Sequence, residues 1–178
     1  MPRDSSNWSA NREYLFAAIA GECWKWNART GELESRFSVP TQTASSAPLD
    51  WSYLSPHRSR VIGSGVVQDS AYTSFWGGGS AGWYDAKTGA VTQKVCSENL
   101  FAVDAKDGRL AWLHRGGLIV NSTITLAGDR AWFVEARHPD LNAGKNRRLG
   151  GSKFWKQQHL VCLDLKTGEI LWSKPLEI

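Results

Sequence analysis

Two stretches of the sequence share one pattern: Leu100-Phe-Ala-Val-Asp104-Ala-Lys-Asp-Gly108-Arg-Leu-Ala-Trp112 and Leu160-Val-Cys-Leu-Asp164-Leu-Lys-Thr-Gly168-Glu-Ile-Leu-Trp172. In each, an apolar run leads to an aspartate, a glycine follows four residues later, and a tryptophan follows eight residues after the aspartate. The two glycines lie 60 positions apart in a chain of 178 residues, which indicates an internal repeat.

The residue types in this pattern predict a β-hairpin. An aspartate side chain accepts a hydrogen bond from the backbone two residues further on and so starts a turn. The glycine adopts the positive φ that closes a short loop without strain. Two partial copies occur at 26–33 and 84–91, but the positions that correspond to the tryptophan hold Ser35 and Gln93.

A second hairpin precedes each full copy. Apolar and β-branched residues at 60–67 and 71–76, and again at 119–126 and 130–135, are separated by short polar turns. Two successive hairpins make a four-stranded antiparallel sheet of about 60 residues. Such a sheet cannot bury both faces alone and must stack on neighbours, so we predict an all-β fold of stacked sheets.

The strand–Asp-x-x-Thr-Gly-x-x-x-Trp pattern resembles the repeat of pyrroloquinoline-quinone-type β-propellers, the quinoprotein-like family. The resemblance covers about residues 13–178 and is strongest over 99–115 and 159–175. It implies that Trp112 and Trp172 dock onto the next blade. The turn residues that accompany these tryptophans are Asp104, Gly108, Asp164 and Gly168. A WD-repeat propeller fits less well, because no Gly-His and Trp-Asp pair occurs at the expected spacing.

The expected organisation is a polar segment over 1–12 and a partial propeller over 13–178. Its blades are predicted at about 13–39, 60–116 and 119–178, with insertions at about 77–98 and 138–158 and only about three strands in the first blade. That makes about two and a half blades, whereas propellers close with four to eight. We therefore expect either the remaining blades or self-association to complete the ring.

Composition and charge exclude several classes of protein. The net charge is +4. The stretch from Arg137 to Lys156 contains six basic residues and a single acid, Asp140, so one loop is basic rather than the whole surface. The basic residues are Arg137, Lys145, Arg147, Arg148, Lys153 and Lys156. No run of 18 apolar residues is present, so no transmembrane helix is expected. The first residues show no signal peptide, whereas the family resemblance implies the periplasm or cell envelope.

The resemblance also suggests a test for a cofactor. Quinoprotein dehydrogenases hold their quinone between a tryptophan and a disulfide of adjacent cysteines, with acidic and amide ligands to calcium. This chain has only Cys23, Cys96 and Cys162, which are far apart in sequence and are expected to be core residues. No cofactor is evident. Pyrroloquinoline quinone and calcium enter only under the alternative that the chain is a fragment of a quinone-dependent dehydrogenase.

The leading functional prediction is a non-catalytic binding or scaffold module whose blade loops meet a protein or an acidic polymer. Basic residues beside an aromatic ring suit such a partner. The candidate binding residues are Arg137, His138, Arg147, Arg148, Lys153 and Trp155. Two simpler readings stay open: the loop charges are merely solvated, and Phe154 and Trp155 pack the insertion onto the sheet.

Overall fold

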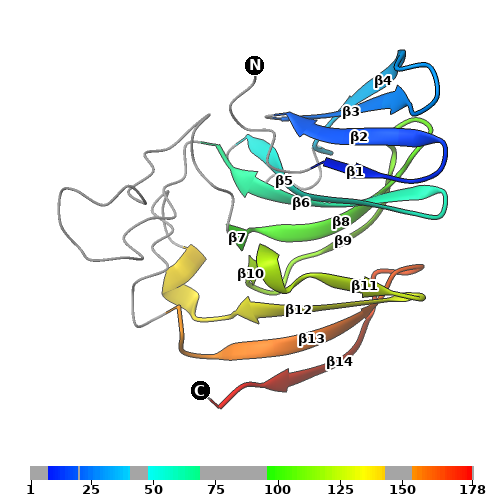
Figure 1. The fold of residues 1–178 in the computed structure, drawn as a ribbon. Coiled ribbons are helices and arrows are strands. Elements are labelled where there is room, and N and C mark those ends of the chain that lie inside the picture. Colours follow the sequence, from blue (N-terminus) through cyan, green and yellow to red (C-terminus); the bar gives the residue numbers. More distant parts are fainter. Residues whose placement is uncertain (1–7, 20, 41–47, 69–95, 143–153, 178) are drawn as a thin grey trace.

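The computed structural model describes residues 8–19, 21–40, 48–68, 96–142 and 154–177. These residues form strands in three antiparallel sheets, with two short 3₁₀ helices at Asn121–Thr123 and Pro139–Asn142. The sheets stack in chain order, from β1–β4 at the top of Figure 1 to β12–β14 at the bottom. The all-β expectation is confirmed.

The first sheet has the order β1–β2–β3–β4 and is a simple antiparallel meander. Its strands are Trp8–Ala10, Tyr14–Ile19, Glu22–Asn27 and Leu33–Ser38. The sequence predicted about three strands over 13–39, and the structure corrects this by adding β1 from the segment taken as a polar terminus. With three residues, β1 is too short to show a period-two pattern.

The second sheet has the order β5–β6–β8–β9. Its strands are Leu49–His57, Arg60–Val67, Asn99–Asp104 and Leu110–His114. Strand β5 was not predicted, because a register shift between Trp51 and Leu54 interrupts its alternation of apolar and polar residues. The predicted strand at 71–76, the turn copy at 84–89 and most of the insertion at 77–98 lie outside the described residues.

The third sheet has the order β14–β13–β12–β10–β7, with β11 also paired to β12. Its strands are Cys96–Ser97 (β7), Leu118–Val120 (β10), Thr125–Ala127 (β11), Arg130–Ala136 (β12), Gln158–Asp164 (β13) and Ile170–Pro175 (β14). The predicted single strand at 119–126 is wrong, since a 3₁₀ turn divides it. The Thr123 hydroxyl stabilises that turn by donating to the Val120 carbonyl oxygen (2.7 Å).

The hydrophobic core lies between the sheets and not within any one of them. Between the first two sheets, Trp51 stands edge-on to Phe101 with ring centroids 4.9 Å apart, and Phe37 packs edge-on against Trp51 at 6.0 Å. A second cluster lies between the second and third sheets; its buried side chains include Ile62, Leu100, Phe133, Val161 and Leu163. Each sheet is therefore stable only against a neighbour, as the repeat pattern predicts.

Candidate functional site

Three turns of the same geometry join the last two strands of the three sheets. We call them turn 1 (27–31), turn 2 (104–108) and turn 3 (164–168). In each turn the first side chain accepts a hydrogen bond from the amide two residues on, over 2.7 to 2.9 Å. The closing glycines have φ values of +73°, +73° and +78°, a region where any other residue is strained. The described residues thus contain the same turn three times.

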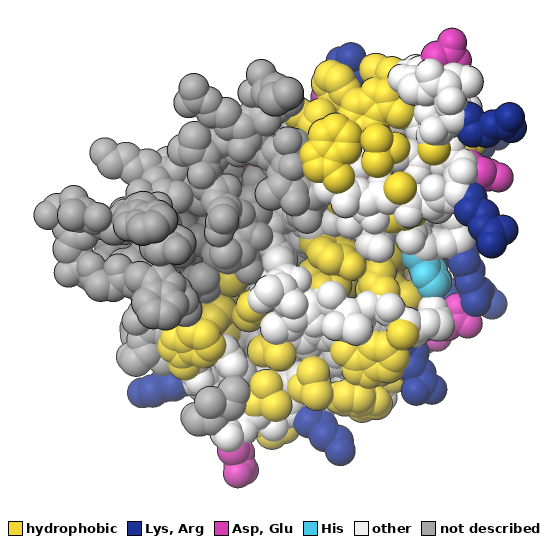
Figure 2. Space-filling view, viewed as in Figure 1, with side chains coloured by type: hydrophobic (Ala, Val, Ile, Leu, Met, Phe, Trp, Pro, Cys, Tyr) yellow, Lys and Arg dark blue, Asp and Glu magenta, His cyan; other side chains and the backbone are white. Residues whose placement is uncertain are grey.

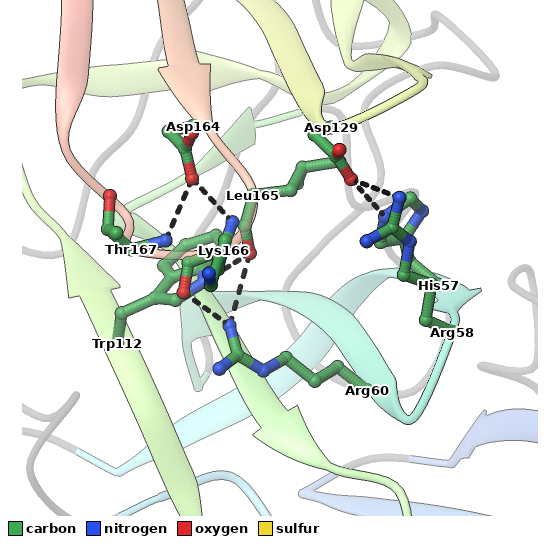
Figure 3. Close-up of polar contacts among 9 residues, drawn as sticks. All are labelled: His57, Arg58, Arg60, Trp112, Asp129, Asp164, Leu165, Lys166 and Thr167. Carbon is green, nitrogen blue, oxygen red and sulfur yellow. Dashed lines mark hydrogen bonds and ion pairs between the residues drawn. The ribbon is translucent and has the colours of Figure 1, made fainter.

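The second sheet docks onto turn 3 through Trp112 (Figure 3). The indole is buried, and its Nε1 donates to the Leu165 carbonyl oxygen over 2.8 Å. A Cβ atom at Gly168 would lie 2.7 Å from Cβ and Cγ of Trp112, closer than real contacts allow. Gly168 is therefore required both by its backbone conformation and by the ring packed against it.

Charged groups surround the same contact. Arg60 at the start of β6 donates from Nη1 to the carbonyl oxygens of Leu165 (3.2 Å) and Lys166 (2.7 Å). Nearby, Arg58 forms an ion pair with Asp129 over 2.6 Å. Hydrogen bonds from the backbone amides of Thr167 and Lys166 hold the pKa of the Asp164 carboxyl below its usual value, so Asp164 stays ionised at neutral pH.

The first sheet docks onto turn 2 by the same principle but with a different residue. A Cβ atom at Gly108 would lie 2.5 Å from Cβ of Phe37. Ser35 of β4 pairs with a residue of β3 two positions before turn 1, just as Trp112 of β9 pairs with a residue of β8 two positions before turn 2. Phe37 lies two residues further along β4 on the same face. Phe37 was not predicted as a docking residue because it lies ten residues after Asn27, whereas Trp112 lies eight residues after Asp104.

Trp172 holds the position of Trp112 on the third sheet. It pairs with Cys162 as Trp112 pairs with Ala102. Its side chain is 37% exposed, and no described sheet lies beyond β14. Apolar side chains gather at both ends of the stack, over β1–β4 and over β12–β14 (Figure 2). Two docking contacts are complete within the described residues: the first sheet on turn 2, and the second sheet on turn 3. At each end of the stack one partner of a further contact is present, Trp172 on the third sheet and turn 1 on the first.

A buried carboxylate ties the second sheet to the third. Glu135 on β12 is fully buried and accepts hydrogen bonds from His114 Nε2 (2.8 Å) and Arg137 Nε (2.6 Å). Burial alone would raise the pKa of Glu135, but the hydrogen bonds and charges of His114 and Arg137 together lower it. A Cβ atom at Gly116 would lie 2.4 Å from Glu135 Oε1, so a side chain there would displace the carboxylate. The sequence singled out Arg137 as a candidate binding residue, but no pattern linked His114 to it or to Glu135.

A second polar cluster lies on the inner strands. Asn121 accepts from the Ser97 hydroxyl over 2.6 Å and donates to the Ser52 hydroxyl over 2.5 Å. Ser64 Oγ lies 2.7 Å from Ser97 Oγ, and the three serines are fully buried. These residues come from β5, β6, β7 and the 3₁₀ turn after β10, so the cluster joins the second and third sheets by hydrogen bonds.

The predicted binding residues have different environments. Arg137 is held by Glu135, and His138 Nδ1 accepts from the Asp140 amide over 3.3 Å. Phe154 is 1% exposed and packs in a cluster with Val66, Cys96, Leu118 and Ala136. Trp155 stands edge-on to Phe154 with centroids 5.1 Å apart and is 46% exposed. Arg147, Arg148 and Lys153 lie outside the described residues.

The described residues do not fit the quinone clamp that the resemblance implies. The three cysteines are free and buried on β3, β7 and β13, so no two are adjacent. Burial raises the pKa of the Cys23 and Cys96 thiols, which keeps them protonated. The Trp112 indole is enclosed between two sheets. Within the described ranges, no group of three His, Cys, Asp or Glu side chains is arranged to hold a metal ion.

Searches of known proteins give structural matches only. No family profile and no curated protein sequence matches the chain. Quinohemoprotein alcohol dehydrogenase from Comamonas testosteroni matches with a TM-score of 0.58 at 11% identity, over 96% of this chain and 27% of that one. A europium-containing methanol dehydrogenase gives 0.53 at 11%, over 96% and 32%. The Pan2 WD40 domain of Neurospora crassa gives 0.52 at 8%, over 97% and 38%.

These similarities concern the fold alone, since all three identities are low. The chain spans between 27% and 38% of the length of the matched structures. No helix in the described part of the chain is long and apolar enough to cross a membrane. Antiparallel sheets of four to six strands that stack through their faces, together with partial coverage of solved β-propellers, identify the fold as an incomplete β-propeller.

Proposed function

We propose that the chain is a non-catalytic scaffold module that binds a protein or an acidic polymer through the insertion at 138–158. The observation that carries the proposal is the pair Phe154 and Trp155. Phe154 is buried in the sheet, whereas the adjacent indole stands in solvent beside Lys156. A large aromatic side chain on a rigid base loses little freedom when a partner covers it, which is typical of binding hot spots.

The surrounding charges support an anionic partner. The insertion is rich in basic residues, and three of them, Arg147, Arg148 and Lys153, precede the aromatic pair. A basic surface raises the local concentration of an acidic ligand and speeds its binding. Two other polar groups near β12, Glu135 and Arg137, are already paired with each other and serve the stability of the stack. The proposal therefore assigns binding to the insertion and rigidity to the sheets. Following the family resemblance, we place the module in the cell envelope.

Charge reversal tests the proposal. The double variant Arg147→Glu/Arg148→Glu is expected to elute from a heparin column at lower salt than the wild type, because the attraction to sulfate groups is lost. Trp155→Ala is expected to weaken binding to the same polymer about tenfold through the lost aromatic contact. The matched control is Lys106→Glu/Arg109→Glu, which makes the same charge change at two exposed positions, one in turn 2 and one directly after it. If the two double variants were retained equally on the heparin column, the insertion would not be the binding surface.

The alternative function, a fragment of a quinone-dependent dehydrogenase, has its own experiment. The purified chain is supplied with pyrroloquinoline quinone and calcium, and reduction of a dye is followed with alcohol or sugar as substrate. We expect no dye reduction above that of the cofactor alone, because the cysteines lie on separate strands and Trp112 is enclosed. Turnover that depends on both the quinone and the chain would overturn the scaffold assignment.

A further inference from the structure

We propose that two copies of this chain associate head to tail, with β14 of one copy docking onto turn 1 of the other. The inference rests on the scaffold function proposed above and names a partner for its two end faces. The chain carries both halves of such a contact: Trp172 and Arg130 on the third sheet, and turn 1 on the first sheet. Each half has its counterpart in the contact already formed between the second and third sheets.

The third sheet carries the outgoing groups. Trp172 has the register of Trp112, and Arg130 has that of Arg60: Arg60 pairs with Asp104 at the start of turn 2, and Arg130 with Asp164 at the start of turn 3. Arg60 and Trp112 both bind carbonyl oxygens of the following turn. Arg130 is exposed and Trp172 is 37% exposed, so both groups are available to bind a further turn.

The first sheet carries the incoming groups. Turn 1 has the same hydrogen bonds and glycine φ as turn 3, but a Cβ atom at Gly31 would meet nothing within 4 Å. The space beside Gly31 is therefore open, whereas the corresponding space beside Gly168 is filled by the Trp112 ring. The carbonyl oxygens of Ala28 and Arg29 correspond in position to those of Leu165 and Lys166, which accept from Trp112 and Arg60.

The faces behind these groups also match. In the second and third sheets, the positions one and three residues before the turn hold Val103 and Phe101, and Leu163 and Val161, all fully buried between sheets. The first sheet has Trp26 and Trp24 there, and Trp8 stacks on Trp26 with centroids 5.7 Å apart and is 53% exposed. An apolar surface of this kind on an end sheet is suited to a further sheet.

The number of copies follows from ring closure. A head-to-tail contact either closes into a ring or continues as a filament. The described residues of each copy form three sheets, so two copies supply six, within the range of four to eight in which propellers close, whereas three copies exceed it. A ring also covers both end faces of each copy, where Trp8 and Trp172 are exposed.

The solution mass of the purified chain tests the proposal. Light scattering after size-exclusion chromatography at micromolar concentration is expected to give twice 19.7 kDa. Trp172→Ala and Gly31→Ala are each expected to weaken the dimer at least tenfold, since one removes the docking ring and the other fills its place. Gly128→Ala controls for strain, because Gly128 also has a positive φ (+57°) and open space around it. Trp155→Ala controls for loss of an exposed tryptophan.

Mixing the variants separates this contact from a symmetric one. Trp172→Ala keeps an intact turn 1 and Gly31→Ala keeps an intact Trp172, so an equimolar mixture regains one good interface and associates more than either variant alone. A monomer of the wild type overturns the proposal, as does a dimer that persists in both variants. Circular dichroism confirms that each variant is folded. Heparin retention is measured separately, so failure here leaves the binding test of the insertion unaffected.

Discussion

Replacement of Trp112 by alanine is expected to lower the free energy of unfolding by about 3–5 kcal/mol, the usual cost of truncating a large buried aromatic side chain. The indole is 6% exposed and packs between the second and third sheets, and its N–H satisfies the Leu165 carbonyl oxygen. Both the apolar contact and the hydrogen bond are lost with the ring. Chemical denaturation monitored by circular dichroism measures the change.

Two further variants serve as controls for the burial and the aromatic character of Trp112. Trp155→Ala removes the same side chain from a position 46% exposed and is expected to cost about 1 kcal/mol or less. Trp112→Phe keeps an aromatic ring, as Phe37 does at turn 2, and is expected to lose only part of the stability. If Trp155→Ala proved as damaging as Trp112→Ala, the docking role of Trp112 would have to be abandoned.

Replacement of Glu135 by glutamine is expected to cost about 3 kcal/mol or more. Removal of one partner from a buried ion pair leaves the other charge without compensation. Arg137 and His114 both bind the Glu135 carboxylate, whose side chain is fully buried. Because glutamine preserves the size of the side chain, the loss measures charge rather than a cavity. Urea denaturation at neutral pH is the appropriate measurement.

The matched control for Glu135 is the surface ion pair of Asp129. Asp129 lies 2.6 Å from Arg58 and also joins the second and third sheets, but both side chains are more than half exposed. Asp129→Asn is expected to cost no more than about 1 kcal/mol, because water screens exposed pairs. A loss as large as that of Glu135→Gln would show that burial does not set the strength of these contacts.

The repeated turns were predictable because their residues act locally. The aspartate and the glycine of turns 2 and 3 fix the backbone within five residues, so their spacing alone indicates hairpins at 104–108 and 164–168. The predicted strands around them follow from apolar runs of ordinary length. The antiparallel sheets of a partial propeller are confirmed for the same reason; two of the three described sheets have four strands, and the third has six.

The contacts between sheets were less predictable, because they join residues far apart in sequence. Glu135 reads as a polar residue at a strand end, and only the packing of β9 against β12 brings His114 to it. Phe37 replaces a tryptophan from a position two residues later, and β5 has a bulge that hides its alternation. Arg137 shows why such contacts are hard to predict. Its charge suggested that it binds a partner molecule, whereas in the fold it donates a hydrogen bond to Glu135.

A double-mutant cycle between Trp112 and Gly168 tests the central claim, that a ring packed against a turn glycine holds neighbouring sheets together. Gly168→Ala alone is expected to cost about 2–4 kcal/mol, from backbone strain and from displacement of the ring. In the Trp112→Ala background the added methyl group no longer meets the ring, although it still lies close to Cβ of residue 112, so the cost of Gly168→Ala falls but does not vanish. We predict a coupling free energy of about 1–3 kcal/mol. Costs that add to within about 0.5 kcal/mol would contradict the account.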